Sequence, residues 1–344
     1  MASPSVSIVL STYNRADMLG PAIEHLLAQA SNSPPYELIV VDNNSTDETR
    51  AVVDAFVSRS GGRLSYLFEP RQGLSHARNT GIAAARAEIV AFTDDDVRVS
   101  AEWVAAIDRA FAGDPDVDCL GGRILPWWPG PTPQWLTRMH WVGPLALQDY
   151  GEKPFGVDAH RPLSLAGANF AFRKSVFGRI GLFSPDFPRS EDTELLIRLW
   201  LAGRRALYVP DMLIYAAVQP ARLTKAYHRE WYSNIGRCNA RMRFEELTHP
   251  VIGLRDRAPE VARFFGAPKF AIRELGLEMW RWLKARFTEP MDARFAHETR
   301  IRLLSAYILE SRGIQRKAGR DRRPPRYTPD CAPAAPGAPT RSEI

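Results

Sequence analysis

Three adjacent carboxylates, Asp94, Asp95 and Asp96, follow the apolar residues 89–92 after one threonine, Thr93. The apolar run predicts a buried strand, and such a strand delivers the residues that follow it to the carboxyl edge of an α/β sheet, where ligands bind. Three acids repel each other unless a cation lies among them. Mg²⁺ and Mn²⁺ prefer oxygen ligands, and Mg²⁺ commonly binds one or two carboxylates together with phosphates. The triplet therefore suggests a metal–diphosphate site. The alternative is a polar turn that caps the next helix, because Ser100 and Glu102 lie just beyond.

A second acidic pair, Glu191-Asp192, comes directly after Pro188 and Ser190. Proline and serine mark a helix start, and the leucines that follow have helical spacing. The two carboxylates therefore lie at the positive end of a helix dipole, which stabilises any acid. Capping explains the pair as well as function does. The functional interpretation is a general base.

The elements that must position these acids alternate between strands and helices. Strands are predicted at residues 6–10, 37–41, 64–69 and 89–93, and helices at residues 17–27, 48–59, 73–87 and 101–112. This alternation predicts an α/β fold with a parallel sheet and crossover helices. Polar residues follow Leu10 and Val41, and acids follow the strand at Phe92, so three loops converge at one crevice.

The rest of the chain divides into three further parts. Residues 125–162 are rich in Pro, Trp and Gly without a clear period, which is typical of a binding loop or of a surface segment held down by its own tryptophans. Residues 221–315 are helical and basic, and their segment 270–287 suits either a membrane interface or packing on the first domain. Residues 316–344 have the composition of a disordered basic, Pro-rich tail. The predicted domains are therefore 1–220, which includes the loop, then 221–315 and 316–344.

Composition and charge exclude several classes of protein. The three cysteines, Cys119, Cys238 and Cys331, are far apart and contain no CxxC pair, which argues against a disulfide framework or a zinc site. We expect no signal peptide and no membrane span. The segment 312–326 holds seven cations and one acid and so accounts for the net charge of +6. Such a tail suits an anionic membrane or a nucleic acid, or is simply solvated.

Five segments in this order resemble the family 2 glycosyltransferases of the GT-A type, which are nucleotide-diphospho-sugar transferases. They are SIVLSTYNR (7–15), LIVVDNNSTD (38–47), GLSHARNTG (73–81), the Asp94–Asp96 triplet and the Glu191-Asp192 pair. The resemblance covers about residues 5–235. It implies a Rossmann-like GT-A fold with a mostly parallel central sheet and flanking helices, to which the rest of the chain adds a C-terminal helical extension.

The resemblance also implies roles for individual residues. The expected donor-binding residues are Thr12, Tyr13, Arg15, Asp42, Arg78, Asp94 and Asp95. Asp42 would accept a hydrogen bond from the base, which suits the N3–H of uracil or thymine. Asp96 would bind Mn²⁺ or Mg²⁺, and Asp192, with Glu191 beside it, would be the catalytic base. The residues expected to flank the acceptor are Gly167, Ala168 and Asn169.

The chain departs from the family pattern at one position that bears on metal binding. Many relatives carry a histidine just after the strand that ends here near Tyr215, whereas this chain has Ala216-Ala217. His228 is the nearest later histidine, but its spacing does not place it at the metal. The departure makes the metal coordination less complete than in those relatives.

The sequence therefore predicts a metal-dependent, inverting glycosyltransferase at the cytoplasmic side of the cell membrane. It would transfer a sugar from a nucleotide diphosphate, UDP favoured, to a glycan or lipid-linked acceptor in cell-surface polysaccharide or glycolipid assembly. The aromatic loop and basic extension are compatible with peripheral membrane contact. The alternatives are a catalytically impaired nucleotide-sugar binding protein and a sugar nucleotidyltransferase. The latter usually has a Gly-rich loop after its first strand, whereas here no glycine precedes Gly20. A nucleic-acid-binding protein would not explain the acidic strand ends.

Overall fold

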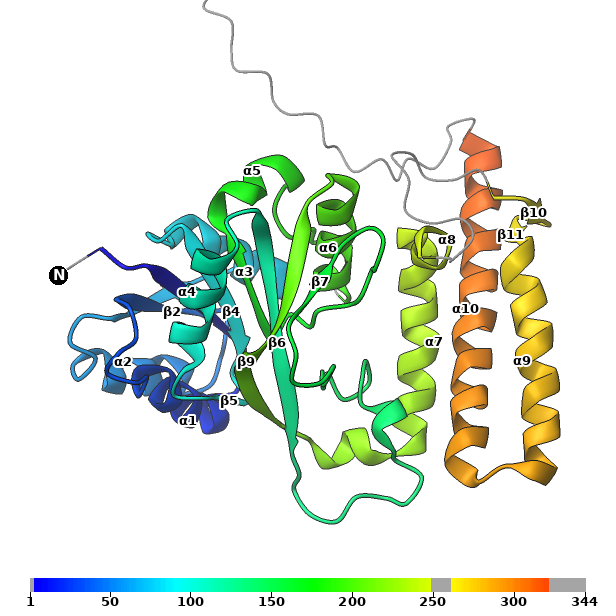
Figure 1. Cartoon of the computed structure of the whole chain (residues 1–344), viewed down its shortest axis with the longest axis horizontal. Helices are drawn as coiled ribbons and strands as arrows, with labels where there is room; N and C mark the ends of the chain where they lie inside the picture. The colour runs from blue at the N-terminus through cyan, green and yellow to red at the C-terminus, as the bar shows by residue number, and fades with distance from the viewer. Residues whose placement is uncertain (1–2, 188, 249–260, 322–344) are drawn as a thin grey trace, which may run out of the picture.

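A nine-stranded mixed sheet forms the centre of the first two thirds of the chain (Figure 1). The computed structural model describes residues 3–187, 189–248 and 261–321. The strand order is β3-β2-β1-β4-β8-β6-β9-β5, and β7 pairs with β9. The strands are β1 (Val6–Thr12), β2 (Tyr36–Asp42), β3 (Leu64–Phe68), β4 (Ile89–Asp94), β5 (Val97–Val99), β6 (Val117–Trp127), β7 (Phe155–Val157), β8 (Asn169–Arg173) and β9 (Arg205–Ala217).

The sheet is parallel in its first half and mixed in its second. β3, β2, β1 and β4 are all parallel neighbours, as the alternation of strands and helices predicts. β8 then runs antiparallel between β4 and β6, and β5 and β7 run antiparallel to β9, while β6 and β9 are parallel. The sequence signals for these later strands are weak because β5 and β7 are only three residues long.

Helices cover both faces of the sheet and divide the core into two layers. The helices of this domain are α1 (Ala16–Leu27), α2 (Thr49–Val57), α3 (Leu74–Ala84), α4 (Trp103–Gly113), α5 (Phe177–Ile180) and α6 (Glu191–Leu201). Alternate residues of β2 enter opposite layers: Leu38 packs in the layer that holds α1 and α4, and Ile39 in the layer that holds α3 and α6. A strand buried on both faces reads as a continuous apolar run, which is why β1, β2 and β4 are visible in the sequence.

The chain then leaves the sheet and forms a helical extension beside it. α7 (Lys225–Met242), α9 (Lys269–Thr288) and α10 (Met291–Asp321) lie side by side, with α10 between the other two (Figure 1). The short helix α8 (Phe244–Leu247) follows α7, and the two-residue strands β10 (Arg263–Phe264) and β11 (Ala267–Pro268) precede α9. Short 3-10 turns η1 (Arg138–His140), η2 (Lys174–Val176) and η3 (Pro220–Leu223) complete the elements.

One predicted boundary is corrected by the structure. The tail was expected to begin at residue 316, but α10 continues to Asp321. Extending an existing helix by one residue costs little, and Arg, Lys, Gln and Ala favour helix. The remainder of the predicted tail, 322–344, lies outside the described residues. Within residues 3–187, 189–248 and 261–321, none of the helices combines the length and the apolar character that crossing a bilayer requires.

Candidate active site

The predicted acids lie at the carboxyl edge of the parallel strands. β4 ends at Asp94, which pairs in register with Ser11 of β1, and Thr12 pairs with Asp42 at the end of β2. β5 begins at Val97, so Asp95 and Asp96 occupy the turn between β4 and β5. The predicted convergence of three strand ends at one edge is confirmed.

Arg15 and Thr12 hold the second and third acids of the triplet. The Arg15 guanidinium lies 2.9 Å from an oxygen of Asp95 and 2.9 Å from an oxygen of Asp96. The Thr12 hydroxyl donates to Asp95 at 2.7 Å. Burial raises the pKa of Asp95 to about 6, and Arg15 opposes that rise. Tyr13, next to Thr12, is exposed at the surface.

Arg78 links the triplet to the second acidic pair. Its guanidinium is buried and lies 2.8 Å from Glu191 of α6 and 3.5 Å from Asp94. Burial raises the pKa of Glu191 to about 7, and Arg78 opposes that rise. Gly167 packs on the guanidinium so closely that a Cβ there would lie 2.7 Å from an Arg78 nitrogen. Two acidic motifs separated by almost 100 residues are therefore one charged cluster.

A second glycine brings Arg78 to this place. α3 carries Arg78 and crosses β1 at Gly81, where an added Cβ would lie 2.3 Å from Val9. Only a residue without a side chain allows the helix and the strand to approach so closely. Asn43, at the end of β2, also supports α3, because its side-chain oxygen accepts from the Gly73 N–H at 2.7 Å. Asn43 lies in the segment 38–47 but was not among the predicted site residues.

Asp192 lines a cavity, whereas the side chain of Glu191 forms an ion pair with Arg78. One Asp192 oxygen accepts from the Gly167 N–H at 2.9 Å, and the other accepts from the Thr193 N–H at 2.6 Å. Both residues line a cavity of about 590 Å³ between the sheet domain and α7, but Glu191 is buried and Asp192 is half-buried. The helix begins after Ser190, as predicted, and Ser190 itself has a left-handed backbone with φ of 65° and no side-chain cap. Asp192 is therefore the carboxylate of the pair that a bound molecule can reach.

Asp42 is buried with both of its oxygens already hydrogen-bonded. The Tyr66 hydroxyl donates to one oxygen at 2.8 Å, and the Ser45 N–H donates to the other at 2.9 Å. Burial and Asp42 raise the pKa of Tyr66 to about 12. Each carboxylate oxygen retains a second lone pair, so Asp42 can still accept from a base. Tyr66 was not predicted at this site, because it lies inside a strand rather than after one.

Asn169 has a different environment from the one expected. Its side-chain oxygen accepts from the Trp103 indole N–H at 2.8 Å, and its side-chain nitrogen donates to the carbonyls of Met212 and Arg123 at 2.7 and 3.0 Å. The residue is fully buried, and Ala168 beside it is also buried. The side chain of Asn169 therefore stabilises the junction of β6, β8 and β9; of the three residues predicted at the acceptor, Gly167 contacts Asp192.

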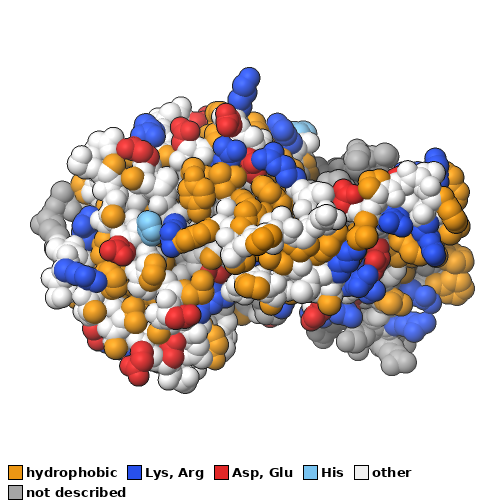
Figure 2. Space-filling view, turned by 90° about the horizontal axis from the view of Figure 1, so that it is seen from below, with side chains coloured by type: hydrophobic (Ala, Val, Ile, Leu, Met, Phe, Trp, Pro, Cys, Tyr) orange, Lys and Arg blue, Asp and Glu red, His pale blue; other side chains and the backbone are white. Residues whose placement is uncertain are grey.

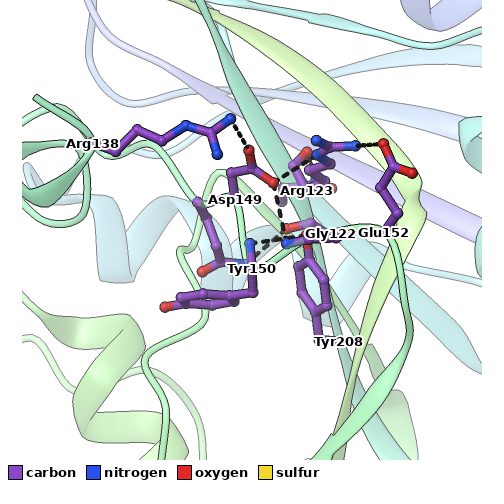
Figure 3. Close-up of polar contacts among 10 residues, drawn as sticks. Gly122, Arg123, Arg138, Asp149, Tyr150, Glu152 and Tyr208 are labelled. Carbon is purple, nitrogen blue, oxygen red and sulfur yellow. Dashed lines mark hydrogen bonds and ion pairs between the residues drawn. The ribbon is translucent and has the colours of Figure 1, made fainter.

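The aromatic loop 125–162 is tied to the sheet by polar contacts (Figure 3). Asp149 lies 2.9 Å from Arg123 of β6 and 3.0 Å from Arg138. The Tyr208 hydroxyl of β9 donates to the Gly151 carbonyl at 3.1 Å and accepts from the Tyr150 N–H at 3.3 Å. These contacts hold the loop against the sheet, and its residues 142–148 form one wall of the Asp192 cavity.

The missing histidine position lies directly beside Asp96. The Ala217 N–H donates to the Asp96 carbonyl at 3.0 Å, and Ala216 pairs with Val97. Both side chains are methyl groups, so neither can bind a metal. His228 is buried in α7 against Trp135, with ring centroids 5.0 Å apart. Among the residues that the structure describes, no group of three or more His, Cys, Asp or Glu side chains is arranged to hold a metal ion.

Comparison with known proteins agrees with this fold. Two solved structures have similar folds: a Pyrobaculum calidifontis mannosyltransferase bound to GDP-Man and Mn²⁺ (TM-score 0.56, 18% identity, 90% of this chain and 88% of that chain) and GalNAc-T7 with UDP, GalNAc and Mn²⁺ (TM-score 0.52, 16% identity, 72% of this chain and 49% of that chain). The chain therefore has the GT-A fold of glycosyltransferases. The sequence profile of glycosyl transferase family 2 matches residues 7–181, about half of the chain, and the chain belongs to this family.

Curated relatives match over the same part of the chain. The glucosyl-dolichyl phosphate glucuronosyltransferase of Haloferax volcanii is 26% identical over 214 residues, which is 59% of this chain and 66% of the relative. The validoxylamine A glucosyltransferase of Streptomyces hygroscopicus subsp. jinggangensis is 29% identical over 222 residues, which is 58% of this chain and 52% of the relative. The chain thus spans between half and two thirds of the length of these relatives.

Proposed function

We propose that this chain is an inverting, metal-dependent glycosyltransferase that transfers a sugar from a nucleotide diphosphate, UDP favoured, to a hydroxyl group. The observation that carries the proposal is the continuous set of contacts from the Asp94–Asp96 turn through Arg78 to Glu191 and Asp192. Sugar transfer requires a site for the donor diphosphate and a carboxylate that accepts the acceptor's proton. In this arrangement the Asp94–Asp96 turn would provide the first and Asp192 the second.

The carboxylate oxygens at this site are suited to bind a hard divalent metal ion. Five carboxylates, Asp94, Asp95, Asp96, Glu191 and Asp192, lie together, and Arg15 and Arg78 form ion pairs with the first four of them. Burial raises the pKa of Asp94, and the carboxylates of Asp96 and Asp192 add to that rise while Arg78 opposes it. Asp96 is the expected ligand for Mn²⁺ or Mg²⁺, and the donor diphosphate would supply the remaining oxygens because no histidine lies at Ala216 or Ala217. When bound, the ion supplies Lewis-acid stabilisation of the departing diphosphate.

The protein side chains perform the remaining tasks. Asp192 accepts the proton of the attacking hydroxyl, and its two backbone hydrogen bonds hold it in the orientation that this requires. Arg78 keeps a fixed positive charge between the donor and acceptor sides. Direct attack by the acceptor, without an enzyme nucleophile, inverts the anomeric carbon. Asp42 binds a uracil base by accepting a hydrogen bond from its N3–H.

The acceptor we favour is a glycan or a lipid-linked sugar used in cell-surface polysaccharide or glycolipid assembly at the cytoplasmic face of the membrane. The helical extension supports peripheral contact with that membrane. Trp280, Leu283 and Phe287 are exposed on one face of α9, with 61%, 54% and 85% of their surface accessible. Figure 2 shows apolar side chains interspersed with Lys and Arg at the end of the molecule that the extension forms. Such a surface suits an anionic bilayer interface.

Calorimetric titration of UDP tests the proposal. We expect binding with Mn²⁺, weaker binding with EDTA, and loss of the metal effect in Asp96→Ala. The control Asp116→Ala removes an exposed acid from the loop before β6 and should bind as the wild type does. Binding of GDP or dTDP instead of UDP would refute only the choice of base. Binding without slow donor hydrolysis would favour the impaired binding protein, and no nucleotide binding at all would refute the transferase.

A further inference from the structure

The cavity that Asp192 faces has walls of unusual composition. It lies between the sheet domain and the extension, and its walls come from residues 142–148, from the start of α6 and from α7 and α10. Three of its residues have left-handed backbones: Gly143, Ala146 and Ser190, with φ of 93°, 55° and 65°. Non-glycine residues adopt this conformation at a cost of about 1–3 kcal/mol, and such strain gathers at ligand sites. The cavity is thus shaped by both domains.

One wall is aromatic. Tyr227 and Trp231 are four residues apart on α7 and so share one helix face, and Tyr232 packs edge-on against Trp231 with centroids 5.0 Å apart. The Trp231 ring lies directly on Gly143 of the loop, where an added Cβ would be 2.4 Å from the ring. Trp231 is half-buried and held in place from the loop side. A fixed aromatic face of this kind binds the apolar face of a sugar ring.

Two of the cationic side chains that line the cavity have no ion-pair or hydrogen-bond partner in the described part of the chain. Among the lining residues, Arg300 is paired with Glu245 and Glu274 at 3.0 and 3.1 Å. Within the described part of the chain, the side chains of Arg189 and Arg222 have no ion pair, hydrogen bond or ring contact. Arg222 is half-buried in the turn η3, and Arg189 is exposed two residues before Glu191.

Two of the three carboxylates in the same cavity are already paired with arginines. Glu191 is bound to Arg78, and Glu245 is bound to Arg300. Asp192 has only N–H and hydroxyl donors as partners. Two arginines without partners therefore line the same cavity as a single carboxylate without a cationic partner, and that carboxylate is the one we assign to proton removal. The cavity is arranged for a ligand that brings its own negative charge.

We propose that the acceptor is a sugar that carries an anionic group, a phosphate or a carboxylate, bound by Arg222 and Arg189. Trp231 contacts the ring, and the attacking hydroxyl lies at Asp192. Guanidinium groups bind both kinds of anion through paired N–H donors. The inference rests on the proposed function, because it assigns the acceptor of the same site. A phosphate of this kind occurs in a soluble sugar phosphate and also in the head group of a lipid-linked sugar.

The test measures binding to protein preloaded with UDP and Mn²⁺. The soluble probes are glucose 1-phosphate, glucuronic acid and neutral methyl glucoside, and the lipid probe is polyprenyl phosphoglucose in detergent micelles, with plain polyprenol as its reference. We expect the anionic probes to bind at least 10-fold more tightly than methyl glucoside. Binding of both phosphate probes, or of the lipid probe alone, supports the inference and identifies the source of the phosphate.

Substitutions test the contributions of the charged and the aromatic wall to binding separately. Arg222→Gln should weaken anionic probes about 10- to 100-fold, the range of a lost charge-assisted hydrogen bond, and leave methyl glucoside and UDP unchanged. Trp231→Ala should weaken anionic and neutral probes alike. Arg109→Gln, an exposed arginine of α4, is the control. Equal binding of neutral and anionic sugars, or equal effects of Arg222→Gln and Arg109→Gln, would overturn the inference. Failure of the wild type to bind any of UDP, GDP and dTDP would instead overturn the proposed function.

Discussion

Replacement of Arg78 by methionine tests whether the two acidic motifs form one charged cluster. The Arg78 side chain is 3% exposed and its partner Glu191 is 9% exposed, so Arg78→Met leaves a buried carboxylate without its cation. Breaking a buried ion pair in this way costs about 3–5 kcal/mol. Glu191→Gln is milder, about 1–3 kcal/mol, because the amide oxygen still accepts from Arg78 and Asp94 remains nearby.

The double variant measures the coupling. If Arg78 and Glu191 interact as the structure places them, Arg78→Met/Glu191→Gln should cost less than the sum of the single changes, by about 1–3 kcal/mol. Denaturant unfolding of the four proteins supplies these values. Additivity within about 0.5 kcal/mol would refute the reasoning, because it would mean that the two side chains do not share a contact.

The pH dependence provides a second, independent check. Burial raises the pKa of Glu191 to about 7, against 4.5 in an unfolded chain, and Arg78 holds it from rising further. Without Arg78 the pKa rises, so the folded state keeps a proton that the unfolded state has released. Stability then falls as pH increases, and the deficit of Arg78→Met should be larger at about pH 8 than at about pH 5. A deficit that is constant with pH would contradict this account.

Three further predictions concern catalysis, acid stability and membrane contact. Asp192→Asn should lower kcat about 10²- to 10⁴-fold with unchanged UDP affinity, and a loss of UDP affinity would instead make Asp192 a donor-side residue. Burial lowers the pKa of His228 to about 4 in the folded state, against 6.5 in the unfolded state. As pH falls, the unfolded state therefore takes up the proton first, and stability should be lost between pH 6.5 and pH 4. His228→Phe should reduce this loss in urea unfolding, and an identical pH profile would contradict it. Replacing Trp280, Leu283 and Phe287 with glutamate should abolish cosedimentation with vesicles containing phosphatidylglycerol; persistence would place the membrane contact elsewhere.

The sequence by itself determined the parallel half of the sheet and the acids at its edge. β1, β2 and β4 are buried on both faces, so each is a continuous apolar run that ends where polar residues begin, and both features are local. The helix start before Glu191 was likewise visible, because the order of proline, serine and acids is a local signal. The five segments together were sufficient to identify the family.

Only the tertiary structure decided which partner each polar side chain has. The resemblance to the family implied that Asn169 flanks the acceptor, yet its amide is buried between three strands that are distant in the chain. Tyr66 reaches Asp42 from the neighbouring strand, and no spacing in the sequence indicates this contact. Hydrogen-bond partners depend on strand order and helix packing, which the sequence pattern does not specify residue by residue.

The cavity beside Asp192 is the clearest case of this difference. Gly143, Arg189, Arg222 and Trp231 belong to four separate segments, and their types carry no signal at their own positions. They meet because the loop 125–162 is anchored to the sheet while α7 packs across it from the extension. A local pattern predicts an element and its end. The charge balance of a cavity arises from contacts between distant elements, so it follows only from the folded chain.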